Sequence, residues 1–342
     1  MIVGHTRNIR YFETVLAKGT FAHAYLFHGP EAVGKRTVAL AVAQALLCSG
    51  MPRNKLEGCL SDRPASPELQ RGEQAGGGCE DCRLMAGGRH PDFILLSFEH
   101  LLVDEDLKRE IGIKNIHELQ RLLALTPWRG GRKIVLIDGA DALSRDARTA
   151  LLKTLEEPQP ATVFFLITDR PDALPPTIRS RSITLGFAPV ADGEITPLIA
   201  TLPPARQKQV LAFAAGRPGL ALRLAGDQKF FGDCRAAQAG FAAVLGAGLD
   251  DQFLFTQGAG PSRAEASTAA AKDGPGALED FFEWLIRRER SELLTSLSSA
   301  AVPGGRAAFI RSLLEKLALM ESTTVNRRLV ADSVFVELAT RV

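Results

Sequence analysis

A glycine-rich loop between an apolar strand and an apolar helix constrains this chain more than any other feature. Residues 29–36 read Gly-Pro-Glu-Ala-Val-Gly-Lys-Arg and fit the phosphate-binding pattern G-x-x-x-x-G-K-[ST] except at the last position. Residues 24–27 form a short apolar run before the loop, and residues 35–48 carry apolar side chains at helical spacing after it. This order of strand, loop and helix predicts a P-loop fold.

Each part of such a loop has a physical task. Gly29 and Gly34 let backbone N–H groups turn inward around phosphate oxygens, and the helix N-terminus adds partial positive charge. Lys35 would reach the terminal phosphates, and the next residue normally binds Mg²⁺ through a hydroxyl. That residue is Arg36 here, and Thr37 lies about 100° further round the helix. The alternative is a glycine turn that opens a helix and binds no nucleotide.

A second departure concerns the acid expected beside the loop. Asp138 follows the apolar strand 133–137, where a Walker-B acid would hold the water shell of the metal. An active ATPase of this kind usually has glutamate next, whereas this chain has Gly139, and Asp141 is too far along to take that place. Hydrolysis of ATP should therefore be very slow. In the alternative interpretation, Asp138 only caps a strand-to-helix turn.

Strand and helix patterns alternate along the first part of the chain. Further apolar strands are expected at 93–96, 163–167 and 183–185, and further helices at 113–125 and 145–157. Strands that are apolar on both faces are typical of a buried parallel sheet, so we expect a doubly wound α/β domain that ends near Phe187. Strand patterns are lacking after Pro189, where a small helical unit and then an Ala-rich helical domain are expected.

Composition places broad limits on function. The chain has 342 residues, which exceeds one typical domain, and its 41 basic residues nearly balance 39 acidic ones. This balance argues against a strongly basic nucleic-acid binder that acts alone. The sequence has no apolar run of membrane-spanning length and no secretory signal pattern, so we expect a cytoplasmic protein. Its five cysteines should then bind metal or pack as core thiols rather than form disulfides.

Four of the cysteines mark a polar, Gly- and Pro-rich segment that interrupts the α/β pattern. Cys79 and Cys82 form a C-x-x-C, Cys48 ends the P-loop helix, and Cys59 lies eleven residues later. Four thiolates suit a tetrahedral structural zinc ion, which would hold together an otherwise unsupported insertion. The alternative is that Cys48 is a small buried hydrophobe and the others are free thiols.

An arginine-containing segment follows the strand that ends at Thr168. Residues 174–182 read Leu-Pro-Pro-Thr-Ile-Arg-Ser-Arg-Ser, and alone such a charge pair usually marks a solvated surface. After a P-loop and a Walker-B-like strand, the segment resembles the Ser-Arg-Cys box of clamp-loader ATPases, with Ser182 in place of the cysteine. In that family the box arginine reaches the γ-phosphate of a neighbouring subunit's ATP, and Arg181 matches its position.

Several segments together resemble the delta-prime family of bacterial DNA polymerase III clamp-loader subunits, which are AAA+ proteins. These segments are residues 23–30, the Cys-Glu-Asp-Cys turn that leads to His-Pro-Asp at 90–92, residues 150–158 and the box at 178–181. The resemblance implies a AAA+ P-loop NTPase-like domain with a parallel sheet, a small helical lid and an all-α collar that assembles a pentamer. The corresponding ranges are 1–187, with a zinc-module insertion at 48–90, then 188–228 and 229–342.

The resemblance also implies a function. The chain would be an ATPase-deficient subunit, without polymerase activity of its own, that donates Arg181 in trans to support loading of the sliding clamp onto primed DNA. The implied partners are the gamma/tau and delta subunits in a hetero-pentamer, with the clamp and DNA reached through the complex. The implied cofactors are a structural Zn²⁺ and, held weakly if at all, ATP or ADP. The degenerate nucleotide site would comprise Gly29, Gly34, Lys35, Arg36, Thr37, Asp138 and Thr168.

One detail separates this chain from the related gamma and tau subunits, and another is a departure from its own family's pattern. Gamma and tau subunits keep an arginine in the lid, where this chain has Gly219, with Arg217 and Arg223 as candidates to compensate. The family's zinc module is more compact, and Gly76 stands three residues before Cys79, where a cysteine is expected. Cys59 would therefore have to complete the set of Cys48, Cys79 and Cys82 across the insertion 60–78.

Two other functions stay open. An active P-loop ATPase motor, gamma/tau-like or similar to a branch-migration helicase, is disfavoured by Arg36 and Gly139. A pure scaffold that uses the fold only for assembly is disfavoured by the Arg181 box, because a scaffold needs no arginine finger. ATPase activity of the isolated chain would distinguish the motor from the other two.

Overall fold

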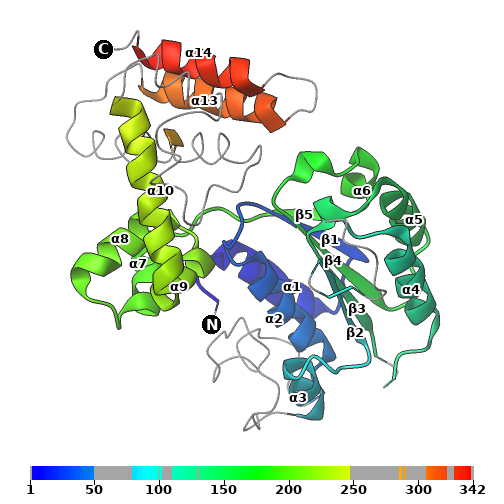
Figure 1. The fold of residues 1–342 in the computed structure, drawn as a ribbon. Coiled ribbons are helices and arrows are strands. Elements are labelled where there is room, and N and C mark those ends of the chain that lie inside the picture. Colours follow the sequence, from blue (N-terminus) through cyan, green and yellow to red (C-terminus); the bar gives the residue numbers. More distant parts are fainter. Residues whose placement is uncertain are drawn as a thin grey trace. The chain divides into compact units, whose positions relative to one another are not determined.

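The computed structural model describes residues 2–49, 79–98, 100–101, 110–128, 131–246, 285–286, 289, 306–321 and 327–339. The chain divides into two compact units, Met1–Leu222 and Arg223–Val342. Figure 1 shows the sheet of the first unit with helices on both of its faces, and the helices of the second unit. No described helix is long and apolar enough to cross a membrane.

A five-stranded sheet in the order β2-β3-β4-β1-β5 forms the centre of the first unit. All of its neighbouring strands pair in parallel, and every residue of β4 is buried. Each predicted strand boundary lies within one residue of the observed boundary, and the doubly wound α/β prediction is confirmed. The strands are β1 (Ala24–His28), β2 (Phe93–Ser97), β3 (Lys133–Asp138), β4 (Thr162–Thr168) and β5 (Ile183–Gly186).

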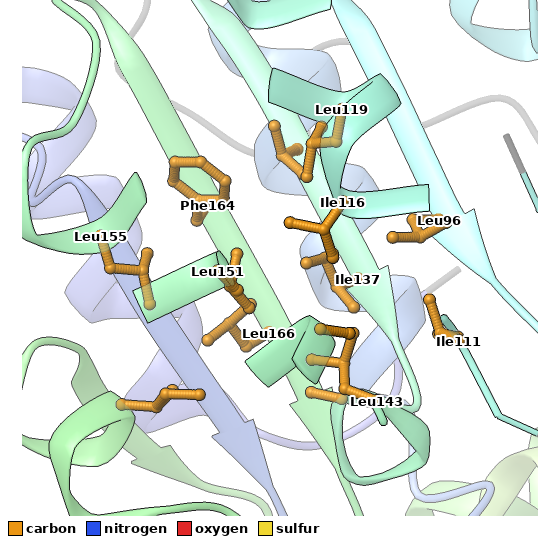
Figure 2. Packing of buried hydrophobic residues seen from close by; sticks show 14 of the residues in the cluster. Leu96, Ile111, Ile116, Leu119, Ile137, Leu143, Leu151, Leu155, Phe164 and Leu166 are labelled. Atoms are coloured by element: carbon orange, nitrogen blue, oxygen red, sulfur yellow. The ribbon is translucent and has the colours of Figure 1, made fainter. Parts of the chain in front are cut away.

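Helices cover both faces of this sheet because successive strand residues point to opposite sides. On one face, α4 (Ile113–Ala124) and α5 (Arg145–Glu156) pack over β3 and β4, as Figure 2 shows for Ile116 and Leu151 above Ile137 and Leu166. On the other face, α1 (Thr6–Lys18) and α2 (Lys35–Leu47) cover a second apolar cluster that includes Phe165. The sheet and the helices on its two faces form the three layers of the unit.

Short elements complete the first unit. Between the strands along the chain lie α3 (Glu80–Ala86), η1 (Ala140–Ala142), η2 (Pro171–Ala173) and α6 (Pro176–Ser180), and after β5 come α7 (Asp192–Ile195), η3 (Thr196–Ile199) and α8 (Pro204–Ala214). The boundary between the two units falls within α9 (Pro218–Gly226). The domain limits at 187 and 228 stay predictions.

The described elements of the second unit are helices. They include α10 (Gln228–Gly246), α13 (Arg306–Glu321) and α14 (Arg327–Ala339). Phe309 and Leu313 of α13 pack against Val334 and Phe335 of α14 in an apolar cluster. The predicted all-α character agrees with these segments, and the Gly-rich stretch at 258–276 lies outside the described residues.

Candidate functional site

The predicted nucleotide-site residues converge at one edge of the sheet. Strands that run in parallel bring their carboxyl ends to the same edge, and β1, β3 and β4 are neighbours here. His28 pairs with Thr168 at the ends of β1 and β4, and Asp138 pairs with Ile167. The loop 29–34 leaves β1 at this edge and enters α2, so it lies beside the ends of β3 and β4.

The glycines of the loop are required by its backbone. Gly29 has φ of 146°, and a Cβ atom there would lie 2.1 Å from the carbonyl oxygen of Phe187. Gly34 has φ of 114° where α2 begins. Both values fall in the region that glycine adopts at little cost and other residues rarely adopt. The local conformation therefore agrees with the phosphate-binding pattern in the sequence.

Lys35 lies across the loop that precedes it. Its Nζ donates to the carbonyl oxygens of Gly29 at 2.6 Å and Pro30 at 2.7 Å. The same Nζ contacts Oδ1 of Asp169 at 2.6 Å, and the Lys35 side chain is only 5% exposed. Asp169 was not among the predicted site residues. Its position directly after the end of β4 is the sequence signal that would have indicated it.

Arg36 forms an ion pair with the Walker-B-like acid. Its Nη1 lies 3.3 Å from Oδ2 of Asp138, and the two side chains are 37% and 24% exposed. Mg²⁺ in proteins prefers a complete octahedron of oxygen ligands. A guanidinium supplies N–H donors and positive charge instead, so the residues at this place fit phosphate better than they fit a magnesium ion.

The residues after β3 and β4 form a separate hydrogen-bonded group. The Asp141 carboxylate accepts from Thr168 Oγ1 at 2.9 Å and from Arg170 Nη2 at 3.0 Å. Gly139, in the place of the usual glutamate, has φ of 83°. A side chain at this position would strain the backbone. Asp141 is thus used to orient Thr168, and the position after Asp138 favours glycine.

The start of α9 packs directly on the loop. The backbone N–H of Gly219 donates to the carbonyl oxygen of Ala32 at 2.9 Å. A Cβ atom at position 219 would lie only 2.9 Å from that oxygen, so glycine permits the close approach. Nε of Arg217 donates to the carbonyl of Ala214 at 3.0 Å, which directs this side chain toward the end of α8.

Three of the four predicted zinc ligands lie together. The Sγ atoms of Cys48, Cys79 and Cys82 are all within 4.8 Å of one another, and those of Cys48 and Cys79 are 3.6 Å apart. Zn–S bonds of about 2.3 Å in a tetrahedron place sulfurs about 3.8 Å apart, so this geometry fits zinc. Cys59 lies outside the described residues.

The environment of Cys79 favours its thiolate. Burial by itself raises the pKa of the Cys79 thiol, but hydrogen bonds from the backbone and side chain of Cys82 and from Cys48 outweigh it and lower the pKa to about 6. A thiolate is the form of cysteine that binds metal ions. The cluster therefore has the spacing that a zinc ion requires, and one of its thiols favours the form that binds metal.

Arg181 lies directly after α6 and is held by α5. Its Nη2 is 2.8 Å from Oε1 of Glu156, and its side chain is 36% exposed. Its Nη1 also donates to the carbonyl of Thr177 at 3.2 Å. Arg179, two residues earlier, pairs with Asp172 at 2.9 Å and is 38% exposed. Glu156 was not among the predicted site residues, although it belongs to the run 150–158 that carries part of the family resemblance.

Comparisons with known proteins agree on one family. The family model described as DNA polymerase III, delta subunit matches residues 4–191. DNA polymerase III subunit delta prime of Pseudomonas aeruginosa is 36% identical over 210 residues, which cover 60% of this chain and 56% of that protein. The Escherichia coli delta prime subunit is 31% identical over 219 residues, covering 62% and 58%. The chain thus spans somewhat more than half the length of these relatives.

The likeness extends to a second type of subunit. DNA polymerase III subunit tau of Escherichia coli is 31% identical over 263 residues, which cover 74% of this chain and 36% of that protein. Delta prime and tau subunits are therefore both relatives of this chain. Which of the two it resembles in function has to be judged from the residues of the site.

Proposed function

Because the chain belongs to the DNA polymerase III delta-subunit family, whose model matches residues 4–191, we propose that it is an ATPase-deficient clamp-loader subunit of the delta-prime kind. The expected membership of this family is confirmed by that match. The observation that carries the finer proposal is the ion pair between Arg36 and Asp138, 3.3 Å apart, at the place where an active P-loop enzyme holds its metal.

The chain's own nucleotide site would bind phosphate without catalysing hydrolysis. Gly29, Gly34 and Lys35 supply the loop N–H groups, the helix N-terminus and a buried cation. Nucleotide, when bound, would supply the phosphates that these groups contact. Attack by water needs a positioned metal and a general base, and Arg36 and Gly139 replace the residues that normally provide them.

Arg181 would act on a partner's nucleotide. A guanidinium offers two parallel N–H donors to phosphate oxygens, which a lysine ammonium does not. The Arg181 side chain is 36% exposed, and an ion pair between exposed groups contributes only about 0–1 kcal/mol. Exchange of Glu156 for a phosphate therefore costs little. The partner subunits would be gamma or tau and delta in a hetero-pentamer that loads a sliding clamp onto primed DNA.

The remaining parts take structural roles in this proposal. Cys48, Cys79 and Cys82, with Cys59 as fourth ligand, would hold a zinc ion that anchors the insertion at 48–90 to the end of α2 and the start of α3. The division into a AAA+ domain at 1–187, a lid at 188–228 and a collar at 229–342 belongs to the same proposal. The collar would carry most of the contacts between subunits.

The experiment that tests this proposal measures ATP hydrolysis by the isolated chain. Wild type and Lys35→Ala should give the same rate, because the Lys35 site lacks the means to position metal and water. A Lys35-dependent rate of about one per second, within the ordinary range of enzymes, would contradict the proposal and favour an active motor. Melting temperatures of both proteins control for loss of fold.

A further inference from the structure

A side chain of this protein, Arg36, carries positive charge where P-loop proteins hold a metal ion. Arg36 is the second residue of α2, directly after Lys35. Its Nη1 lies 3.3 Å from Oδ2 of Asp138, which ends β3. In P-loop proteins the hydroxyl at the first of these positions and the acid at the second lie on either side of Mg²⁺. A guanidinium here extends from one position to the other and places positive charge between them.

We infer that this loop binds the phosphates of a nucleotide without a divalent metal, with the Arg36 guanidinium in the metal's place. The inference rests on the proposed nucleotide site but is independent of the role of Arg181. Binding of Mg²⁺ here would require Arg36 to leave Asp138, and the incoming ion would meet a like charge and lack the usual hydroxyl ligand.

The charges of the site are balanced within the chain. Lys35 pairs with Asp169 at 2.6 Å and Arg36 pairs with Asp138 at 3.3 Å. Asp169 is 45% exposed and Arg36 is 37% exposed, so solvent reaches both pairs. When a phosphate enters, Lys35 and Arg36 give up their contacts with the carboxylates and contact the phosphate instead. Since the carboxylates stay nearby, affinity should be modest and should fall as salt rises.

Free nucleotide should therefore bind at least as well as its magnesium complex. A bound Mg²⁺ neutralises part of the phosphate charge that Lys35 and Arg36 attract, which weakens this attraction. Position 36 carries no metal ligand that would compensate for it. This is the reverse of an active P-loop enzyme, in which the metal links the phosphates to the protein. The bound nucleotide would remain unhydrolysed because a guanidinium does not activate water.

A binding titration of the full chain with a fluorescent ADP tests the inference. The titration is carried out in excess EDTA and in excess MgCl₂ with wild type, Lys35→Ala, Arg36→Lys and Arg36→Thr. Wild type should bind equally in both buffers or better in EDTA, and Lys35→Ala should bind at least about tenfold more weakly, as expected for loss of a charge-assisted contact. Arg36→Lys should stay independent of metal because it keeps the charge.

Arg36→Thr should reverse the preference. It restores the hydroxyl and removes the guanidinium from Asp138, so binding should become about tenfold tighter with magnesium than without. Wild-type binding that tightens tenfold with magnesium would overturn the inference, and so would the lack of Lys35-dependent binding in either buffer. Melting temperatures show that each variant is folded. Because only the isolated chain is used, a negative result leaves the trans role of Arg181 untouched.

Discussion

Arg36 and Arg181 are alike in surroundings and opposite in proposed role. Their side chains are 37% and 36% exposed, and each forms an ion pair with a carboxylate of its own chain. Arg36 lies in the first turn of α2 and pairs with the acid that would otherwise accompany a metal. Arg181 follows the short helix α6 and pairs with Glu156, which no P-loop chemistry requires. In the proposed function, the place of an arginine, more than its exposure, determines whether it blocks catalysis at its own site or assists it at another.

The largest expected effect concerns Arg181 in a reconstituted clamp-loader assembly with primed DNA. Arg181→Lys should lower DNA-stimulated ATP hydrolysis at the affected interface by about 10²- to 10³-fold, because lysine keeps the charge but lacks the planar fork. The loss for the whole assembly should be smaller, since other ATP sites keep their own arginines.

Arg179→Lys is the matched control for this change. Arg179 lies two residues earlier, with a comparable exposure of 38% and its own carboxylate partner, Asp172. Its substitution should leave the rate within about twofold, as for ordinary surface ion pairs. Equal losses for the two variants would mean that the whole box, rather than Arg181, matters.

Gly29→Ala should disrupt the phosphate-binding loop that precedes Arg36. The new Cβ would lie 2.1 Å from the Phe187 carbonyl oxygen on a backbone with φ of 146°. The free energy of unfolding should fall by at least about 2 kcal/mol, measured by chemical denaturation. Gly193→Ala in α7, where a Cβ meets nothing within 4 Å, should be neutral or slightly stabilising. Similar losses in both variants would contradict the loop geometry.

Glu156→Gln should release Arg181 from its ion pair, which tests whether that pair restrains Arg181. The ion pair at 2.8 Å has to break before Arg181 contacts a partner's phosphate. The DNA-stimulated rate of the assembly should therefore rise by about two- to threefold, as expected for a pair worth less than about 1 kcal/mol. Glu157→Gln, at the next position, which is also exposed, is the control. A lower rate for Glu156→Gln alone would show that Glu156 orients Arg181 for catalysis.

Loss of metal from the cysteine cluster should leave the roles of Arg36 and Arg181 unchanged. Purified chain should contain about one zinc ion, and the double variant Cys79→Ser, Cys82→Ser should lose it, as measured by metal analysis. Proteolysis should then cut the segment 49–89 faster, while ATPase rates of the assembly change less than about twofold, because structural zinc supports its own module. Metal-free wild type, purified under reducing conditions, would favour free thiols instead.

Local patterns in the sequence predicted the elements and the loop well. Runs such as 133–137 and 163–167 are apolar on both faces, which only a buried parallel strand requires, and Gly29 and Gly34 stand where the backbone needs positive φ. The partners of the charged residues could not be predicted in the same way. Lys35 and Asp169 are 134 positions apart, and their contact depends on how β1 and β4 pair.

Two further contacts show the same limit. Gly219 was expected to be a lost arginine position, but its backbone contact with Ala32 is a packing feature that spacing alone does not reveal. Glu156 belongs to a run that was recognised only as a family resemblance, and its pairing with Arg181 joins α5 to the end of α6. Long-range electrostatic pairing requires the three-dimensional arrangement, whereas periodicity and turn chemistry are local.

The most direct test compares Lys35→Ala with Arg181→Ala in the same reconstituted assembly, with DNA-stimulated ATP hydrolysis as the measurement. The account predicts that Lys35→Ala leaves the rate within about twofold, whereas Arg181→Ala slows the affected site by about 10³-fold. Assembly of each variant is verified by size-exclusion chromatography. A loss with Lys35→Ala equal to that with Arg181→Ala would show that hydrolysis by the assembly depends on this chain's own loop, which would contradict the account.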